Sequence, residues 1–246
     1  MSIDYSHAPR APFPRSIDEV FYAYCWALKN SELLGSTGEN IVFVGDSAGG
    51  SFITACIIKC IEMGIRKPKG LLNIYTVLLT NNAAIPSRFF GWFDVLTSYT
   101  LFSRCIAAYN GYEKQVAVTE NRKIPKSLID ETFKIPDDHL FSPYLASEEI
   151  LKEFPPTVML TANLDFCLDE NVEFARKLKK SKINFKLEVL EGLNHGFLHY
   201  ANVFIKILGH DQLNNLNFVP RCQRIVKSVP INVSNICQIF WGCKMN

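Results

Sequence analysis

Short apolar runs alternate with amphipathic stretches along the first 208 residues of the chain. Residues 41–44 form a run of β-branched and aromatic side chains, which is typical of a strand buried on both faces of a parallel sheet. Similar runs predict strands over residues 71–79, 156–162 and 183–190. In the last of these, apolar and polar residues alternate with the period of two expected at a sheet edge with one wetter face.

The segments between the predicted strands have helical spacing. Apolar residues recur at helical intervals from about residue 16 to residue 34, and Ser16 and Glu19 have the spacing of a capping box at the start of this helix. Residues 52–63 carry few charges and predict a largely buried helix, and residues 171–180 predict another. Residues 2–5 read as the end of a further strand.

The order of these elements predicts an α/β fold with a mainly parallel sheet flanked by helices. We expect one domain over residues 1–208, because single α/β domains often reach this length. The aromatic-rich residues 83–112 predict a mixture of helix and loop, and the polar residues 113–138 a surface insertion. Residues 209–246 have no clear period, so we expect a tail of unclear structure and assign it no function.

Composition and charge restrict the partners. The chain has 246 residues, a formal net charge of +2 and both signs interspersed, so no basic surface for nucleic acid is expected. Its N-terminus lacks a secretory layout, and no run is long and apolar enough to span a bilayer. We therefore expect a cytoplasmic protein whose eight cysteines are mostly reduced, with no zinc spacing among them.

One serine lies between glycines directly after a predicted strand. Residues 45–49 read Gly-Asp-Ser-Ala-Gly, a G-x-S-x-G pattern centred on Ser47. This pattern alone arises by chance in roughly one chain in twelve of this length. The alternative without a catalytic function is a glycine-rich turn. A strand before it and a helix after it match a nucleophile elbow, whose sharp turn lifts the serine Oγ out of the sheet. We therefore predict that Ser47 is a nucleophile.

A serine hydroxyl needs a base to take its proton, and the base needs a group that fixes its tautomer. In this fold the chain order is serine, acid, histidine, with both partners on loops after later strands. His195 follows the strand predicted over residues 183–190 and is therefore the predicted base. The remaining histidines lie too early in the chain, inside the next predicted helix or in the tail: His7, His139, His199 and His210.

The acid is expected at the carboxyl end of the strand over residues 156–162. Asp165 has this position and is the predicted orienting carboxylate, with Asp169 as the fallback. Asp169 and Glu170 come at the start of the next helix, where acidic residues commonly cap the backbone. A structural role at the helix N-terminus therefore suits both residues well.

Further stretches carry a family signature beyond these three residues. They are residues 2–14 (SIDYSHAPRAPFP), 21–26 (FYAYCW), 34–39 (LGSTGE), 45–50 (GDSAGG), 141–144 (FSPY), 164–169 (LDFCLD) and 194–197 (NHGF). With these motifs in this order, residues 1–208 resemble the hormone-sensitive-lipase family of α/β-hydrolases. By this resemblance Ser47, Asp165 and His195 match the catalytic triad of the family.

The resemblance implies a serine carboxylic-ester hydrolase or lipase that acts on acylglycerols or related acyl esters through an acyl-enzyme. By the same resemblance, the activity needs no cofactor and no metal. The expected partners are a lipid or acyl-ester substrate and the surface of a lipid droplet. The backbone N–H of Ala48 would help to bind the oxyanion.

The sequence departs from the family pattern in several places. The His-Gly-Gly-Gly stretch that supplies further oxyanion donors is absent, so we expect the N-terminal strands of the fold to be missing. The alternative function is therefore a catalytically impaired or non-enzymatic relative that binds a small molecule or lipid. Arg10 stands where the family usually has glutamate, and residues 113–138 replace a longer insertion of vertebrate relatives. Residues 122–127 could be a kinase target, although exposed charge is the simpler interpretation.

The aromatic run over residues 89–93, Phe-Phe-Gly-Trp-Phe, has two interpretations. It could line or rim an acyl-binding pocket, or it could contribute to the core. Because aromatic residues at this density usually serve the core, we expect the second.

Overall fold

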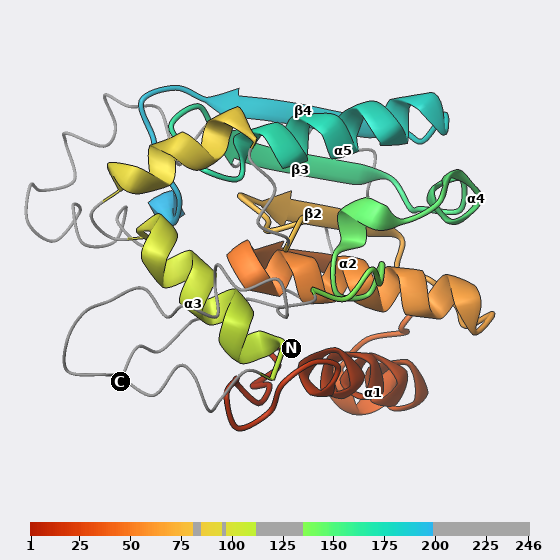
Figure 1. The fold of residues 1–246 in the computed structure, drawn as a ribbon. Helices are drawn as coiled ribbons and strands as arrows, with labels where there is room; N and C mark the ends of the chain where they lie inside the picture. The colour runs from red at the N-terminus through yellow and green to blue at the C-terminus, as the bar shows by residue number, and fades with distance from the viewer. Residues whose placement is uncertain (81–84, 95–96, 112–134, 199–246) are drawn as a thin grey trace, which may run out of the picture.

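The computed structural model describes residues 1–80, 85–94, 97–111 and 135–198. Their centre is a four-stranded sheet in the order β1 (Val42–Asp46), β2 (Gly70–Ile74), β3 (Thr157–Ala162) and β4 (Phe185–Leu190). All three strand pairs are parallel, so the carboxyl ends of the strands point to one edge. The arrows labelled β2 and β4 in Figure 1 show this common direction. The predicted α/β fold with a parallel sheet is confirmed.

The helices follow the strands in the predicted alternation. They are α1 (Arg15–Lys29), α2 (Ser47–Glu62), α3 (Tyr99–Tyr109), α4 (Glu148–Leu151) and α5 (Leu168–Lys180), with the 3-10 helices η1 (Ser31–Leu34), η2 (Pro86–Trp92) and η5 (Pro143–Leu145). The expected mixture of helix and loop around residues 83–112 is present as η2 and α3. Among the described residues, no helix combines the length and apolarity needed to cross a bilayer.

One face of the sheet packs against α1, α2 and α5. In Figure 1, α2 and α5 lie across the strands and α1 lies below α2. Phe43, Leu71 and Met159 point from the strands into this core. Their neighbours Val44, Leu72 and Val158 belong to a cluster on the opposite face, as the period of two in a strand requires. β1, β2 and β3 are thus covered on both faces, whereas β4 has a single buried residue, Leu190, as the predicted sheet edge with a wetter face requires. The loops of the site lie at the carboxyl ends of the four strands.

The amino-terminal segment differs from the sequence prediction. Residues 1–7 form no strand, and the capping box predicted from Ser16 and Glu19 is wrong. Ser16 lies inside the first turn of α1 and donates its hydroxyl to the Ser6 carbonyl, while Glu19 accepts from the Ser6 N–H at 2.7 Å. Both side chains hold the preceding segment against the helix because tertiary contacts replace the local cap. The helix predicted to residue 34 ends at Lys29 and continues as η1.

The strand predicted over residues 71–79 is too long. β2 ends at Ile74, and Tyr75 has a φ of +37°, which turns the chain away from the sheet. Residues 75–80 remain buried although they make no strand pairing in the sheet. Because burial alone produces the apolar run, the sequence pattern could not show where the strand ends. The predicted insertion and the tail fall mostly or wholly on residues 112–134 and 199–246, which lie outside the described residues.

Candidate active site

Each of the four strands delivers one residue to the same edge of the sheet. Ser47 directly follows β1, Tyr75 directly follows β2, Asp165 comes three residues after β3, and His195 comes five residues after β4. In open parallel sheets this edge is where ligands bind, because the loops after the strands converge there. The parallel topology therefore brings together residues from distant parts of the chain.

Ser47 occupies a sharp turn from strand to helix. It is the first residue of α2 and has a φ of +50°, a conformation that side chains other than glycine rarely adopt. The flanking glycines permit this turn, since a Cβ at Gly45 would lie 2.9 Å from the Gly49 carbonyl oxygen. A Cβ at Gly50 would overlap Thr76 on the neighbouring chain segment. These contacts explain why the motif needs small residues on both sides of the serine.

His195 lies against Ser47. The Ser47 Oγ is 2.8 Å from His195 Nε2, and the imidazole is almost completely buried. On its other side, His195 Nδ1 lies 3.0 Å and 3.1 Å from the two carboxylate oxygens of Asp165. A carboxylate can only accept, so Nδ1 carries the proton and Nε2 is free to accept from the serine hydroxyl.

Asp165 is held rigidly in this position. It has no exposed surface, and its Oδ1 also accepts the Cys167 N–H at 2.7 Å. The loop before it is bonded to the histidine loop, because the Leu164 N–H donates to the Leu193 carbonyl and the Gly192 N–H to the Asn163 side chain. The acid and base loops thus form one hydrogen-bonded unit.

Two aromatic rings enclose the imidazole. The centre of the Phe166 ring lies 4.6 Å from that of His195, and the Tyr75 ring lies 5.1 Å away in an edge-on arrangement. The Tyr75 hydroxyl donates to Asp46, the residue before the serine, at 3.0 Å. Burial raises the pKa of Tyr75, so its hydroxyl stays protonated and remains a donor. Tyr75 therefore links the serine turn to the histidine.

The fallback acid, Asp169, does not reach the histidine. Its carboxylate accepts the Ser87 N–H at 2.7 Å, and the Ser87 hydroxyl accepts the Asp169 N–H. Its neighbour Glu170 is completely buried and paired with Arg88 at 2.6 Å. The two acids thus connect α5 to η2, a connection that local sequence patterns could not reveal.

Ala48 is the second residue of α2 and is exposed at the turn. N–H groups in the first turn of a helix have no intrahelical partner and lie at its positive end. The Ala48 N–H thus belongs to the first turn of α2, and its role as an oxyanion donor stays a prediction.

Asp165, Cys167 and His195 are the single group of three potential metal ligands found in the described ranges. The hydrogen bonds of His195 already use both ring nitrogens, and burial raises the pKa of the Cys167 thiol well above its ordinary value. Since a metal needs a free imidazole nitrogen and a thiolate, this group fits a hydrogen-bonded triad better than a metal centre.

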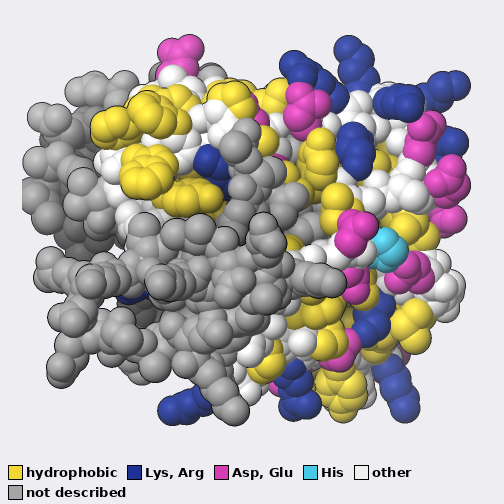
Figure 2. Space-filling model, viewed as in Figure 1, with side chains coloured by type: hydrophobic (Ala, Val, Ile, Leu, Met, Phe, Trp, Pro, Cys, Tyr) yellow, Lys and Arg dark blue, Asp and Glu magenta, His cyan; other side chains and the backbone are white. Residues whose placement is uncertain are grey.

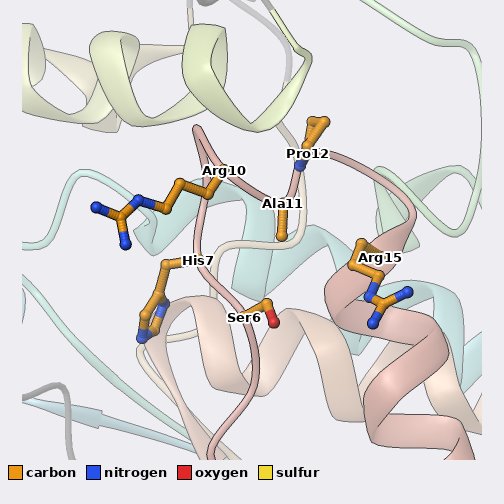
Figure 3. Close-up of a pocket in the computed structure, with 6 residues that line it drawn as sticks. All are labelled: Ser6, His7, Arg10, Ala11, Pro12 and Arg15. Carbon is orange, nitrogen blue, oxygen red and sulfur yellow. The ribbon is translucent and has the colours of Figure 1, made fainter.

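The other described histidines lie elsewhere. His139 pairs with Glu62 on the surface, and His7 lines an open pocket of about 720 Å³. Figure 3 shows His7 and Arg10 projecting from one side of the amino-terminal segment, whereas Arg15 points to the other side, where it bonds Glu19. His199 and His210 lie outside the described residues.

The aromatic run contradicts its expected place in the core. Phe89, Trp92 and Phe93 are 63%, 68% and 70% exposed, whereas Arg88 and Asp94 of the same segment are only 5% and 8% exposed. Figure 2 shows hydrophobic side chains gathered over η2. The prediction was wrong because residue type alone does not reveal that the charged residues of this segment are the buried ones. Arg88 forms an ion pair with Glu170, and Asp94 accepts a hydrogen bond from Asn194, so the aromatic side chains face outward.

The parallel sheet, the strained serine at its carboxyl edge and the histidine–aspartate pair beside it define a protein of the α/β-hydrolase class. A family described as alpha/beta hydrolase fold matches residues 1–199, and the chain belongs to this family.

Hormone-sensitive lipase of Mus musculus is 46% identical over 114 residues, which are 46% of this chain and 15% of that protein. Ethyl acetate hydrolase of Pseudomonas putida is 24% identical over 204 residues, or 82% of this chain and 57% of that protein. The crystal structure of carboxyl esterase 2 from Tuber melanosporum superimposes with a TM-score of 0.65 at 25% identity, covering 79% of this chain and 57% of the esterase. The predicted resemblance to the hormone-sensitive-lipase family is confirmed, and this chain spans little more than half of these relatives at most.

Proposed function

We propose that this protein is a serine carboxylic-ester hydrolase with Ser47 as nucleophile, His195 as general base and Asp165 as orienting acid. The 2.8 Å approach of Ser47 Oγ to His195 Nε2 carries this proposal. The imidazole takes the serine proton as Oγ attacks the ester carbonyl, and it returns that proton to the leaving alkoxide. Water then hydrolyses the acyl-enzyme by the same two proton transfers, which restores Ser47.

The oxyanion of each tetrahedral intermediate accepts a hydrogen bond from the Ala48 N–H at the positive end of α2. The glycine-rich stretch that supplies further donors in the family is absent from this sequence. Loss of one such donor costs about 2.7–4 kcal/mol of barrier, or roughly 10²–10³ in rate. We therefore expect slow turnover of this chain compared with its longer relatives.

The substrate class we propose is an acyl ester with an apolar acyl group, such as an acylglycerol. The exposed aromatic face of η2, formed by Phe89, Trp92 and Phe93, supports this choice because aromatic side chains favour the boundary between lipid and water. We also propose that the protein is cytoplasmic and that this face binds the surface of a lipid droplet, because that surface is likewise a boundary between lipid and water.

Hydrolysis of a chromogenic short-chain ester by the purified protein and by Ser47→Ala tests the proposed chemistry. We expect the variant to lose the activity, and equal rates for both proteins would refute the role of Ser47. A fluorophosphonate probe adds a second measurement, since it labels an activated serine even where turnover is slow. Absence of both turnover and labelling in the wild type would favour the alternative of a non-catalytic binding protein.

A further inference from the structure

The segment of residues 86–94 is bonded at one end to the loop that carries the acid. The Ser87 hydroxyl and the Arg88 guanidinium both donate to the Phe166 carbonyl, at 3.0 Å and 3.1 Å. Phe166 directly follows Asp165, and its ring packs against the imidazole of His195. Arg88 therefore acts on the residue that touches both members of the acid–base pair.

The position of Arg88 is itself fixed by a buried network. Its Nη2 donates to Glu170 at 2.6 Å and to the Leu79 carbonyl at 2.7 Å, and its guanidinium lies 4.6 Å from the centre of the Phe102 ring. The other oxygen of Glu170 accepts the N–H groups of Leu78 and Leu79. A planar guanidinium with several partners in fixed directions holds a carbonyl more precisely than a flexible ammonium does.

The opposite end of the same segment is bonded to the loop that carries the base. Asp94 accepts the side-chain amide of Asn194 at 3.2 Å and the Thr97 N–H at 2.9 Å. Asn194 directly precedes His195, and Asp94 is 8% exposed. One nine-residue segment thus bonds the neighbours of both catalytic partners, although 30 positions separate Asp165 from His195.

We propose that residues 86–94 are a brace that sets the orientation of His195 between Ser47 and Asp165, with Arg88 and Asp94 as positioning residues. The inference rests on the proposed ester hydrolysis, because orientation matters only if the imidazole must accept a proton from the serine. Misplacement of a reacting group by about 1 Å can cost on the order of 10² in rate. Neither residue touches the reacting atoms, so each acts through Phe166 or Asn194.

The test compares Asp94→Ala, Asn194→Ala and their double variant with wild type. We expect each single variant to lower kcat by about 10- to 100-fold with KM changed less than about threefold, and the double variant to be no worse than either single one. Arg88→Lys should fall between wild type and Arg88→Met, because the ammonium keeps the charge but not the fork. Tyr24→Phe is the matched control: it removes a partly buried hydrogen bond from α1 to the Arg66 carbonyl, which involves neither loop.

The NMR signal of the His195 Nδ1 proton provides a readout that does not depend on turnover. We expect this signal to shift or broaden in Asp94→Ala and to stay unchanged in Tyr24→Phe at equal thermal stability. An unchanged signal and unchanged kcat in Asp94→Ala and Arg88→Met would overturn the brace. A wild type that neither turns over ester nor labels with fluorophosphonate would instead overturn the proposed function, and the proton signal would still decide whether the segment orients His195.

Discussion

The Ser47 hydroxyl and the His195 imidazole lie 2.8 Å apart although 148 positions separate them along the chain. The four parallel strands bring the two residues together, because all four end at the same edge of the sheet and the loops that follow them lie at the site. The contact is supported from both sides, by Asp165 on the far nitrogen and by Tyr75 and Phe166 on the ring.

Replacement of the acid tests the tautomer argument. Asp165→Asn keeps the size of the side chain but can donate to Nδ1, which favours the imidazole form that cannot accept from Ser47. We expect kcat for ester hydrolysis to fall by roughly 10³- to 10⁴-fold with little change in folding, measured by steady-state kinetics and circular dichroism. Asp169→Asn serves as the comparison, and an equal loss in both variants would contradict the assignment of Asp165.

The serine turn predicts an unusual effect of alanine. Gly→Ala inside a helix ordinarily stabilises a protein by about 0.5–1 kcal/mol. At Gly50 the added Cβ would overlap Thr76, so we expect Gly50→Ala to destabilise the fold by about 1–3 kcal/mol and to lower activity. Urea denaturation measures the first effect. A stabilised Gly50→Ala protein would show that the helix and the neighbouring segment are not packed as closely as described.

Glu170 predicts a pH dependence of stability. Burial raises its pKa from the ordinary 4.5 to about 7 in the folded protein, against the opposing effect of Arg88. Between these two values the folded state holds a proton that the unfolded state has lost, so the free energy of unfolding falls as pH rises through this window.

Denaturation of wild type and Glu170→Gln at several pH values between 4 and 8 isolates this contribution. We expect the difference in stability between the two proteins to change across the window in the direction given above. A constant difference would mean that the pKa of Glu170 is the same in the folded and the unfolded protein.

The exposed aromatic face of η2 predicts a difference between dissolved and aggregated substrates. Trp92→Ser with Phe93→Ser removes apolar surface that is already largely exposed, so stability should change by less than about 0.5 kcal/mol. We expect hydrolysis of an emulsified triacylglycerol to fall severalfold while hydrolysis of a dissolved short-chain ester stays within about twofold. Equal losses on both substrates would place these side chains in the acyl site itself rather than at a lipid surface.

Local patterns in the sequence were sufficient for much of the fold and for the identity of the candidate triad. The period of the apolar runs locates β1, β3, β4, α2 and α5, because burial on one or two faces leaves a repeat that can be read along the chain. Glycines around Ser47 mark the turn, and the order of serine, acid and histidine selects Asp165 and His195 for their positions after strands. The capping box failed because Ser16 and Glu19 bond to the distant Ser6.

The amino-acid sequence by itself determined the alternation of strand and helix, the strained serine turn and the residue types available for ester chemistry, since each of these depends on neighbours along the chain. Only the tertiary structure decided that Asp94 holds Asn194, that Arg88 and Glu170 are buried as a pair, and that Phe89, Trp92 and Phe93 face outward. Charges of this kind can be buried only where partners from remote segments meet them, and no local pattern records where those segments will lie.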